Sequence, residues 1–211
     1  MGKVLAVTNQ KGGVGKTTTS VNLAASLVAT KRKVLLIDLD PQGNATMGSG
    51  VNKHALENSI YDVLVDDLSI AQARLATTPG FDLIAANGDL TAAEVELLDM
   101  DDKEQRLKRA LAPVQGEYDY IIIDCPPSLN MLTLNALAAA DSVLIPVQCE
   151  YYALEGLTAL LNTIEQVRAS INPDLQIEGL LRTMYDPRNK LADAVSDQLL
   201  ENFGDRVYRT L

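Results

Sequence analysis

The chain has 211 residues, of which 47% are hydrophobic and 22% charged, a composition typical of one soluble globular domain with a substantial core. Its apolar runs are all shorter than the roughly 20 residues that span a bilayer, and its N-terminus lacks a secretory signal pattern, so we expect no membrane partner. The net charge of −10 argues against a broadly basic surface for nucleic acid, although it leaves room for a local basic patch.

The N-terminal part of the chain has the order strand, glycine-rich loop, helix. Residues 4–7 form an apolar run typical of a buried strand, and apolar side chains recur at helical spacing over residues 19–29. Between them, residues 10–18 read Gln-Lys-Gly-Gly-Val-Gly-Lys-Thr-Thr. In this context the glycines allow consecutive N–H groups to face a phosphate, and the helix N-terminus adds positive charge. We therefore predict a phosphate-binding loop.

Strands continue to alternate with helices along the rest of the chain. Buried strands are predicted at residues 34–37, 81–86, 120–123, 143–147 and 177–181, and another begins at 207–211. Helices are predicted at residues 59–65, 69–76, 90–98, 103–111, 129–139, 154–170 and 191–203. Residues 45–58 are expected to form a loop with a short turn. The alternation predicts an α/β fold with a doubly wound, mostly parallel sheet, as in P-loop NTPases, in a single domain over residues 1–211.

The loop carries side chains with specific chemistry. Lys16 is placed to hold the β- and γ-phosphates of a nucleotide, and the Thr17 hydroxyl is placed to ligate Mg²⁺. Lys11 is a second lysine in the loop. A single nucleotide held by a single subunit does not require it, and on an ordinary loop it would simply be solvated. The predicted nucleotide-binding residues are Lys11, Gly12, Gly13, Val14, Gly15, Lys16, Thr17 and Thr18.

Three aspartates stand at the ends of predicted strands, where open α/β sheets bind their ligands. Asp124 ends an apolar run in the form of a Walker B carboxylate, and we predict that it holds Mg²⁺ through water. Asp38 and Asp40 lie two residues apart and share a face of an extended strand. Two carboxylates side by side repel each other unless a cation lies between them or they serve separate tasks, and we assign Asp38 to the metal and Asp40 to the attacking water. From spacing alone, Asp40 is equally well a turn initiator before Pro41.

Together these motifs resemble one family of ATPases. Lys11–Thr18 resembles the deviant Walker A motif of the ParA/MinD group, Asp38–Asn44 its second motif, and Ile121–Ser128 its Walker B motif. Gln148–Leu157 and Thr183–Asp186 resemble the chromosomal ParA (Soj) branch. In that family the first lysine reaches the nucleotide of a partner subunit. The resemblance therefore implies three catalytic residues: Lys11, Lys16 and Asp40. Among them, Lys11 from the second subunit would neutralise developing charge, much as an arginine finger does.

The resemblance implies a partition ATPase with ATP/ADP and Mg²⁺ as cofactors. Such a protein forms an ATP sandwich homodimer in the cytoplasm and coats nucleoid DNA without sequence preference. A centromere-bound ParB-like partner stimulates its slow hydrolysis and so releases it. Arg188 lies where the family carries a DNA-contacting arginine, and the turn-forming pair Asp186-Pro187 would present it on a loop. The alternative for Arg188 is a solvated arginine paired with Asp186.

Family members usually continue past this point, through a loop that touches adenine, a closing helix and basic residues that help bind DNA. We therefore expect the chain to be truncated at its C-terminus, with an incomplete adenine pocket and an incomplete DNA-binding surface. Loss of those basic residues would also account for the acidic balance of the remainder.

Three other functions compete with DNA partition. A MinD-like protein would be a membrane-cycling ATPase anchored by a C-terminal amphipathic helix, but the Asp-Pro-Gln-Gly-Asn and Asp-Cys-Pro-Pro-Ser motifs favour ParA. An iron–sulfur reductase would need bridging cysteines, whereas Cys125 and Cys149 lack C-x-x-C spacing and are typical of buried thiols. A ParA-like ATPase that positions plasmids or a protein assembly would carry the same motifs, so the cargo stays open.

Overall fold

The structure is a computed structural model that describes residues 2–210, and a seven-stranded sheet forms its centre. In spatial order the strands are β3 (Leu75–Ala76), β4 (Asp82–Ile84), β2 (Val34–Asp38), β5 (Tyr120–Asp124), β1 (Lys3–Val7), β6 (Ser142–Gln148) and β7 (Gln176–Thr183). All pairs are parallel except β3 with β4. The prediction of a doubly wound, mostly parallel α/β sheet is confirmed.

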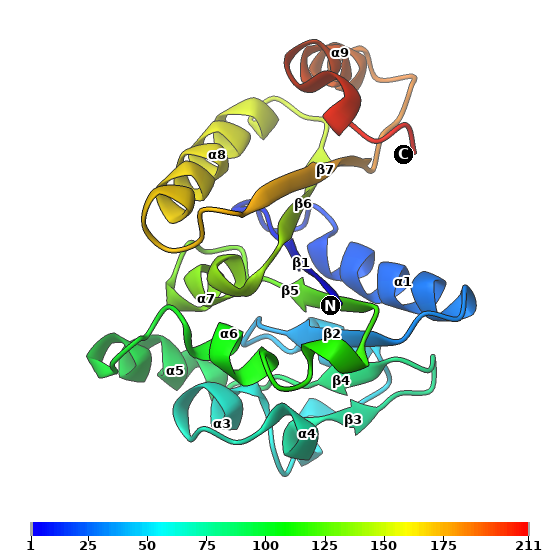
Figure 1. Ribbon diagram of the computed structural model, residues 1–211. Coiled ribbons are helices and arrows are strands. Elements are labelled where there is room, and N and C mark those ends of the chain that lie inside the picture. The colour runs from blue at the N-terminus through cyan, green and yellow to red at the C-terminus, as the bar shows by residue number, and fades with distance from the viewer. Residues whose placement is uncertain (1, 211) are drawn as a thin grey trace.

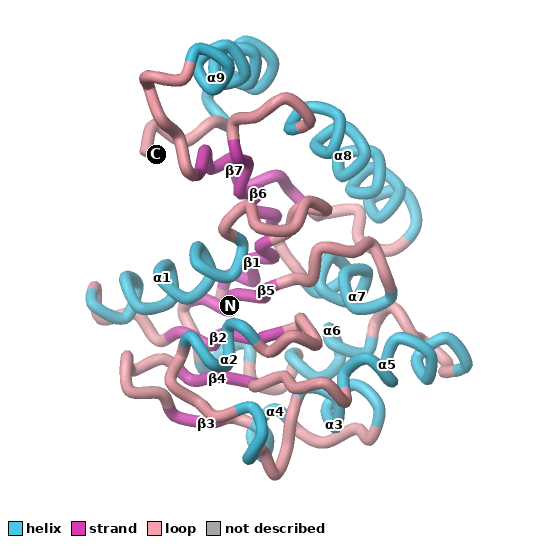
Figure 2. Tube along the Cα trace, turned by 180° about the vertical axis from the view of Figure 1, so that it is seen from behind, coloured by secondary structure: helices cyan, strands magenta, loops and turns pink. Residues whose placement is uncertain are grey.

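Helices cover both faces of this sheet (Figures 1 and 2). On one face lie α1 (Lys16–Ala29) and the short α2 (Asn44–Gly48). The other face carries α3 (Ile60–Val65), α4 (Ile70–Ala73), α5 (Leu90–Glu96), α6 (Arg106–Leu111), α7 (Met131–Ala139) and α8 (Ala153–Ser170). Helix α9 (Lys190–Phe203) follows β7, near the C-terminal end of the chain (Figure 1). Single 3₁₀ turns occur at Lys53–Ala55, Leu97–Asp99, Gln115–Glu117 and Gly204–Arg206.

The core is split in two by the sheet because side chains alternate along each strand. In β2, Leu36 packs on the α1 face, whereas Leu35 and Ile37 pack against the helices of the other face. Cys125 and Cys149 are buried free thiols, as predicted. Within residues 2–210, no helix is both long enough and apolar enough to span a bilayer.

Three local predictions need correction. Residues 45–58 are more ordered than expected. Helix α2 begins at Asn44, and its Thr46 bonds to Asp38 at the end of the preceding strand β2. The helix predicted at 69–76 ends at Ala73, because Leu75–Ala76 pair with β4 instead. The strand predicted at 207–211 is only one bridge, between Val207 and Leu180, and Leu211 lies outside the described residues. In the first two cases a contact outside the segment accounts for the local structure.

The carboxyl ends of three parallel strands form the bed of the site. Val7 at the end of β1 lies opposite Asp124 at the end of β5, and Asp124 lies opposite Asp38 at the end of β2. Strand β1 is also the point where the chain order reverses, with β5 and β2 on one side and β6 on the other. Ligands of open α/β sheets bind at such a switch point.

Candidate active site

The loop between β1 and α1 has the backbone of a phosphate-binding loop. Gly13 and Gly15 have φ angles of 76° and 88°, in the left-handed region that other residues rarely adopt. Gly15 stands directly before α1, so the loop leads straight into a helix N-terminus. Within residues 2–210, the amides from Gly12 to Thr18 donate no hydrogen bond to the protein. They are therefore free to donate to a ligand.

The ammonium of Lys16 lies beside these amides. Its side chain is only 7% exposed, and Nζ donates a hydrogen bond of 3.0 Å to the carbonyl oxygen of Lys11. Burial lowers the pKa of Lys16 from its ordinary value, and the nearby carboxylates of Asp124 and Asp40 partly offset this effect. A buried cation among free amides favours an anionic ligand.

Asp124 is held by two hydroxyls from α1. Thr17 Oγ1 donates to Asp124 Oδ2 at 2.7 Å, and Ser20 Oγ donates to Oδ1 at 2.8 Å. Burial raises the pKa of Asp124 to about 6, although both hydrogen bonds oppose the rise. The structure thus brings together Thr17 and Asp124, two of the residues that the sequence assigned to the metal, and adds Ser20, which sequence reasoning missed. Ser20 lies four residues after Lys16, and this spacing places both side chains on the same face of the helix, which could have indicated its place in the site.

Asp38 is fully buried at the end of β2. Its Oδ2 accepts hydrogen bonds from both the amide and the hydroxyl of Thr46, each at 2.7 Å, and Oδ1 accepts one from the Asp40 amide at 3.2 Å. Burial, together with the charge of Asp124 opposite, raises the pKa of Asp38 to about 7. Two buried carboxylates in register form a site that would gain from a cation.

Asp40 has features of both interpretations that the sequence allowed. Its Oδ1 accepts a hydrogen bond of 2.9 Å from the Gln42 amide, the geometry of an aspartate that initiates a turn. Oδ2 accepts no hydrogen bond within residues 2–210, and the residue is 9% exposed. One oxygen is therefore used by the turn, and the other remains available to a ligand or water.

Lys11 is engaged within its own subunit. Its Nζ forms an ion pair with Glu150, in the loop between β6 and α8, and both residues are half-buried. Tyr151 and Tyr152 follow directly, stacked edge to face and 74% and 64% exposed. Sequence reasoning missed the Lys11–Glu150 pair, because only the fold brings the two loops together.

Two further bonds tie the loop to the neighbouring strands. Thr183 Oγ1, at the end of β7, donates to the Val14 carbonyl oxygen at 2.8 Å. Asn9 Nδ2 donates to the Pro146 carbonyl oxygen of β6 at 2.7 Å. The loop is thus anchored on the β6–β7 side of the switch point, opposite the carboxylates on β5 and β2.

Arg188 lies in the turn between β7 and α9. Its Nε and Nη2 donate to the two carboxylate oxygens of Asp186 at 2.9 and 2.8 Å, while its side chain stays 88% exposed. In this structure Arg188 is therefore a solvated arginine paired with Asp186, the second of the two interpretations that the sequence allowed. An exposed pair of this kind typically contributes little to stability.

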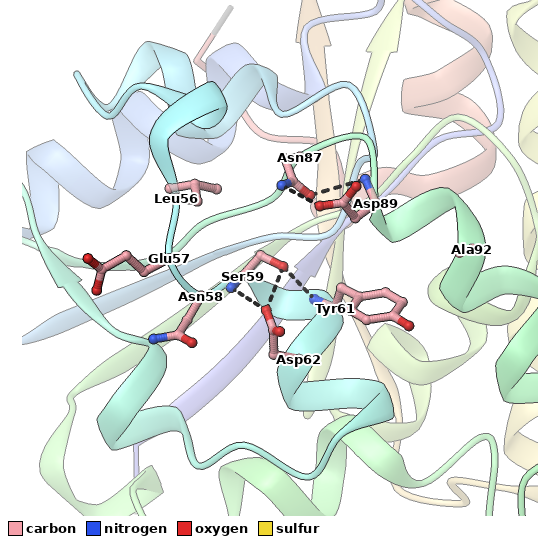
Figure 3. Close-up of a pocket in the computed structure, with 9 residues that line it drawn as sticks. All are labelled: Leu56, Glu57, Asn58, Ser59, Tyr61, Asp62, Asn87, Asp89 and Ala92. Carbon is pink, nitrogen blue, oxygen red and sulfur yellow. Dashed lines mark hydrogen bonds between the residues drawn. The ribbon is translucent and has the colours of Figure 1, made fainter.

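Two hollows accompany the site. A mainly apolar groove of about 720 Å³ runs from the loop along α1 to β7, and its lining includes Gly15, Thr18, Leu144, Leu181 and Met184. A smaller polar hollow of about 360 Å³ lies between residues 56–62 and 87–92 (Figure 3). In Figure 3 its polar groups bond to one another: the amide of Ser59 donates to Asp62 at 2.7 Å, and Asn87 donates to Asp89 at 2.9 Å. Only the groove is continuous with the loop.

Comparisons with known proteins decide the family. A family model described as an AAA domain matches residues 2–177. The sporulation initiation inhibitor protein Soj of Bacillus subtilis is 56% identical over 100% of this chain and 84% of its own length. The chromosome partitioning protein ParA of Myxococcus xanthus is 51% identical over 100% of this chain and 75% of its own length. The chain belongs to the ParA/Soj family.

A solved structure supports the same fold for this ParA/Soj family member. The cobyrinic acid a,c-diamide synthase from Mycobacterium smegmatis, with a bound ATP analogue and magnesium, matches with a TM-score of 0.92 and 45% identity. The match covers 97% of this chain and 84% of that one. The predicted family and the predicted P-loop fold are therefore both confirmed.

Proposed function

We propose that this ParA/Soj family member binds and hydrolyses ATP with Mg²⁺ at the loop between β1 and α1. The observation that carries the proposal is the set of free amides from Gly12 to Thr18 around the buried Lys16 ammonium. A triphosphate is the ligand that such a cradle fits, with Lys16 against the β- and γ-phosphates. The apolar groove that begins at Gly15 leaves room for the nucleoside.

Mg²⁺ would be held by Thr17, Asp124 and Asp38. The Thr17 hydroxyl already points at Asp124, and Asp38 lies opposite Asp124 in register. Within residues 2–210 there is no cluster of three or more acidic, histidine or cysteine side chains able to hold a metal alone. This donor set suits Mg²⁺, which typically binds to one or two carboxylates together with substrate phosphates. When bound, the ion would neutralise charge on the phosphate oxygens.

Asp40 would orient the attacking water. Its Oδ1 is anchored by the Gln42 amide, which leaves Oδ2 as the oxygen that can accept a hydrogen bond from that water. Phosphoryl transfer depends mainly on such positioning and on neutralising charge, rather than on covalent participation by the protein. Asp40 is therefore assigned to turnover rather than to nucleotide affinity.

Lys11 would act on the nucleotide of a second subunit in an ATP sandwich homodimer. Its own subunit already has Lys16 at the loop, and Lys11 instead contacts Glu150. In the dimer Lys11 would leave Glu150 and reach the partner's phosphates. This step would make rapid hydrolysis depend on assembly.

The biological role that fits this cycle is DNA partition. The Soj and ParA relatives carry names that refer to sporulation and to chromosome partitioning. We propose that the ATP dimer binds nucleoid DNA without sequence preference, through a local basic surface that includes Arg188. A ParB-like centromere-binding partner would stimulate hydrolysis and release the protein. Chromosome, plasmid and protein cargoes all suit this site.

The test combines binding, assembly and sedimentation. Titration calorimetry is expected to show ATP binding that depends on Lys16, and sedimentation velocity is expected to show dimers with Mg²⁺·ATP. The dimer is then mixed with DNA at low salt or with anionic lipid vesicles, and it should pellet with DNA. Failure to bind ATP would overturn the proposed enzyme. ATP-dependent pelleting with vesicles in place of DNA would replace partition with a MinD-like membrane cycle.

A further inference from the structure

We propose that Thr46 is a positioning residue that sets which oxygen of Asp38 faces the magnesium site. The inference rests on the proposed function, because it concerns the metal that the nucleotide brings. Thr46 is fully buried and belongs to α2, the short helix that lies beside β2 (Figure 2). It was not among the residues that the sequence predicted for the site.

Thr46 occupies one oxygen of the Asp38 carboxylate. A carboxylate oxygen has two lone pairs, and Oδ2 receives both the Thr46 amide and the Thr46 hydroxyl at 2.7 Å. Oδ1 receives only the longer bond of 3.2 Å from the Asp40 amide. Oδ1 is therefore the oxygen with capacity left for a metal-bound water, and Thr46 keeps the carboxylate from rotating away.

Thr46 is itself fixed from a third element. Its hydroxyl donates to Asp38 and accepts a hydrogen bond of 2.9 Å from the amide of Ala86, just after β4. The single hydroxyl thus connects the ends of β2 and β4 through α2. A donor that is itself held by a backbone amide loses little further freedom when it orients a ligand.

A purely structural role makes a different prediction. Removing the hydroxyl leaves the Ala86 amide without its partner, which lowers stability whatever Asp38 does. It would not change how tightly the folded protein holds a divalent cation. Ser49 provides a matched control, because its buried hydroxyl also lies in this segment, donates to the Ala45 carbonyl oxygen at 2.7 Å, and makes no bond to Asp38.

The experiment measures Mn²⁺ binding to the ADP complex by electron paramagnetic resonance, with ADP affinity in EDTA and thermal unfolding measured alongside. Thr46→Val should weaken Mn²⁺ binding by about 10-fold, the usual effect of losing a residue that orients a metal ligand, and leave ADP affinity in EDTA unchanged. Thr46→Ser, which keeps the hydroxyl, and Ser49→Ala should both stay within about twofold of the parent.

A second variant covers the case in which Thr46→Val does not fold. Thr46→Cys preserves side-chain size with a weak donor, so it should bind Mn²⁺ less tightly than Thr46→Ser. Equal Mn²⁺ affinity in the parent and in the folded Val or Cys variant would overturn the inference while leaving the proposed ATPase intact. If the parent itself binds no ADP, the proposed function fails, and the role of Thr46 fails with it.

Discussion

The ammonium of Lys11 and the carboxylate of Glu150 form an ion pair between the β1–α1 loop and the loop before α8. Both residues are half-buried at the site's margin, next to the exposed Tyr151 and Tyr152. Lys11 therefore has a partner within its own subunit. Any action on a second subunit's nucleotide requires that partner to be exchanged.

Lys11→Ala should leave the nucleotide affinity of the monomer nearly unchanged but abolish ATP-dependent dimerisation and stimulated hydrolysis, because in the proposed site Lys16, and not Lys11, would contact the subunit's own phosphates. Titration calorimetry and sedimentation velocity measure the two effects. Glu150→Gln should strengthen the dimer, by no more than about fivefold, since a partly exposed ion pair contributes at most about 1 kcal/mol. A weaker dimer in Glu150→Gln would mean that Glu150 holds Lys11 in its active position instead.

Lys16→Ala should weaken ATP binding by roughly 10- to 100-fold, because a charged hydrogen bond contributes about 1.5–3 kcal/mol. Titration calorimetry measures this change. Lys108→Ala, at an exposed position on α6, is the control and should bind like the parent. Parent-like affinity in Lys16→Ala would refute the phosphate-loop assignment.

Asp40→Ala should separate binding from turnover. Mg²⁺·ATP is expected to bind because Thr17, Asp38 and Asp124 remain, whereas the hydrolysis rate falls and the ATP dimer persists. Phosphate release and sedimentation velocity follow the two properties. We expect the parent rate to be slow, and a variant that hydrolyses at that rate would remove Asp40 from the mechanism.

Asp38 should make the ligand-free protein less stable as pH rises. Its pKa is 3.8 in a free chain and about 7 in the fold, so the folded state binds more protons across that window. The stabilising contribution is therefore complete below the lower value and is lost as pH rises through the upper one. In thermal unfolding, the parent should lose more stability than Asp38→Asn between about pH 5 and pH 8. Parallel pH curves for the two proteins would contradict this burial effect.

The affinity for Mg²⁺ should also depend on the ionisation of Asp38. Because the ion prefers ionised carboxylates, Mn²⁺ or Mg²⁺ binding to the nucleotide complex should tighten as pH rises toward 8. Asp38→Asn should bind the ion more weakly and with a flatter pH dependence.

Arg188→Ala should weaken DNA binding equally for all sequences. The chain's net charge of −10 opposes a phosphate backbone, so binding is expected only at low salt. Loss of one phosphate contact per subunit should flatten the slope of log affinity against log salt by about 1 for each arginine. Arg109→Ala, at an exposed ion pair on α6, is the control. An unchanged salt slope in Arg188→Ala would leave this arginine as a partner of Asp186 only.

The local chemistry of this protein is specified by consecutive residues. The run of glycines before Lys16 requires a backbone that only a tight loop satisfies, and the apolar runs ending in Asp38 and Asp124 require buried parallel strands. These are short-range constraints, written in consecutive residues. The α/β class, the order of most helices and strands, and the family were therefore all predictable from the chain alone.

Which side chains meet across the site depends on how the chain folds in three dimensions. Thr46 reaches Asp38 through a short helix whose small and polar residues carry no periodic signal, and Glu150 reaches Lys11 across two loops. The same holds for the bond from Thr183 to the Val14 carbonyl oxygen. Such pairs arise because the sheet places the ends of its parallel strands side by side, and no spacing along the chain encodes which side chains then face each other.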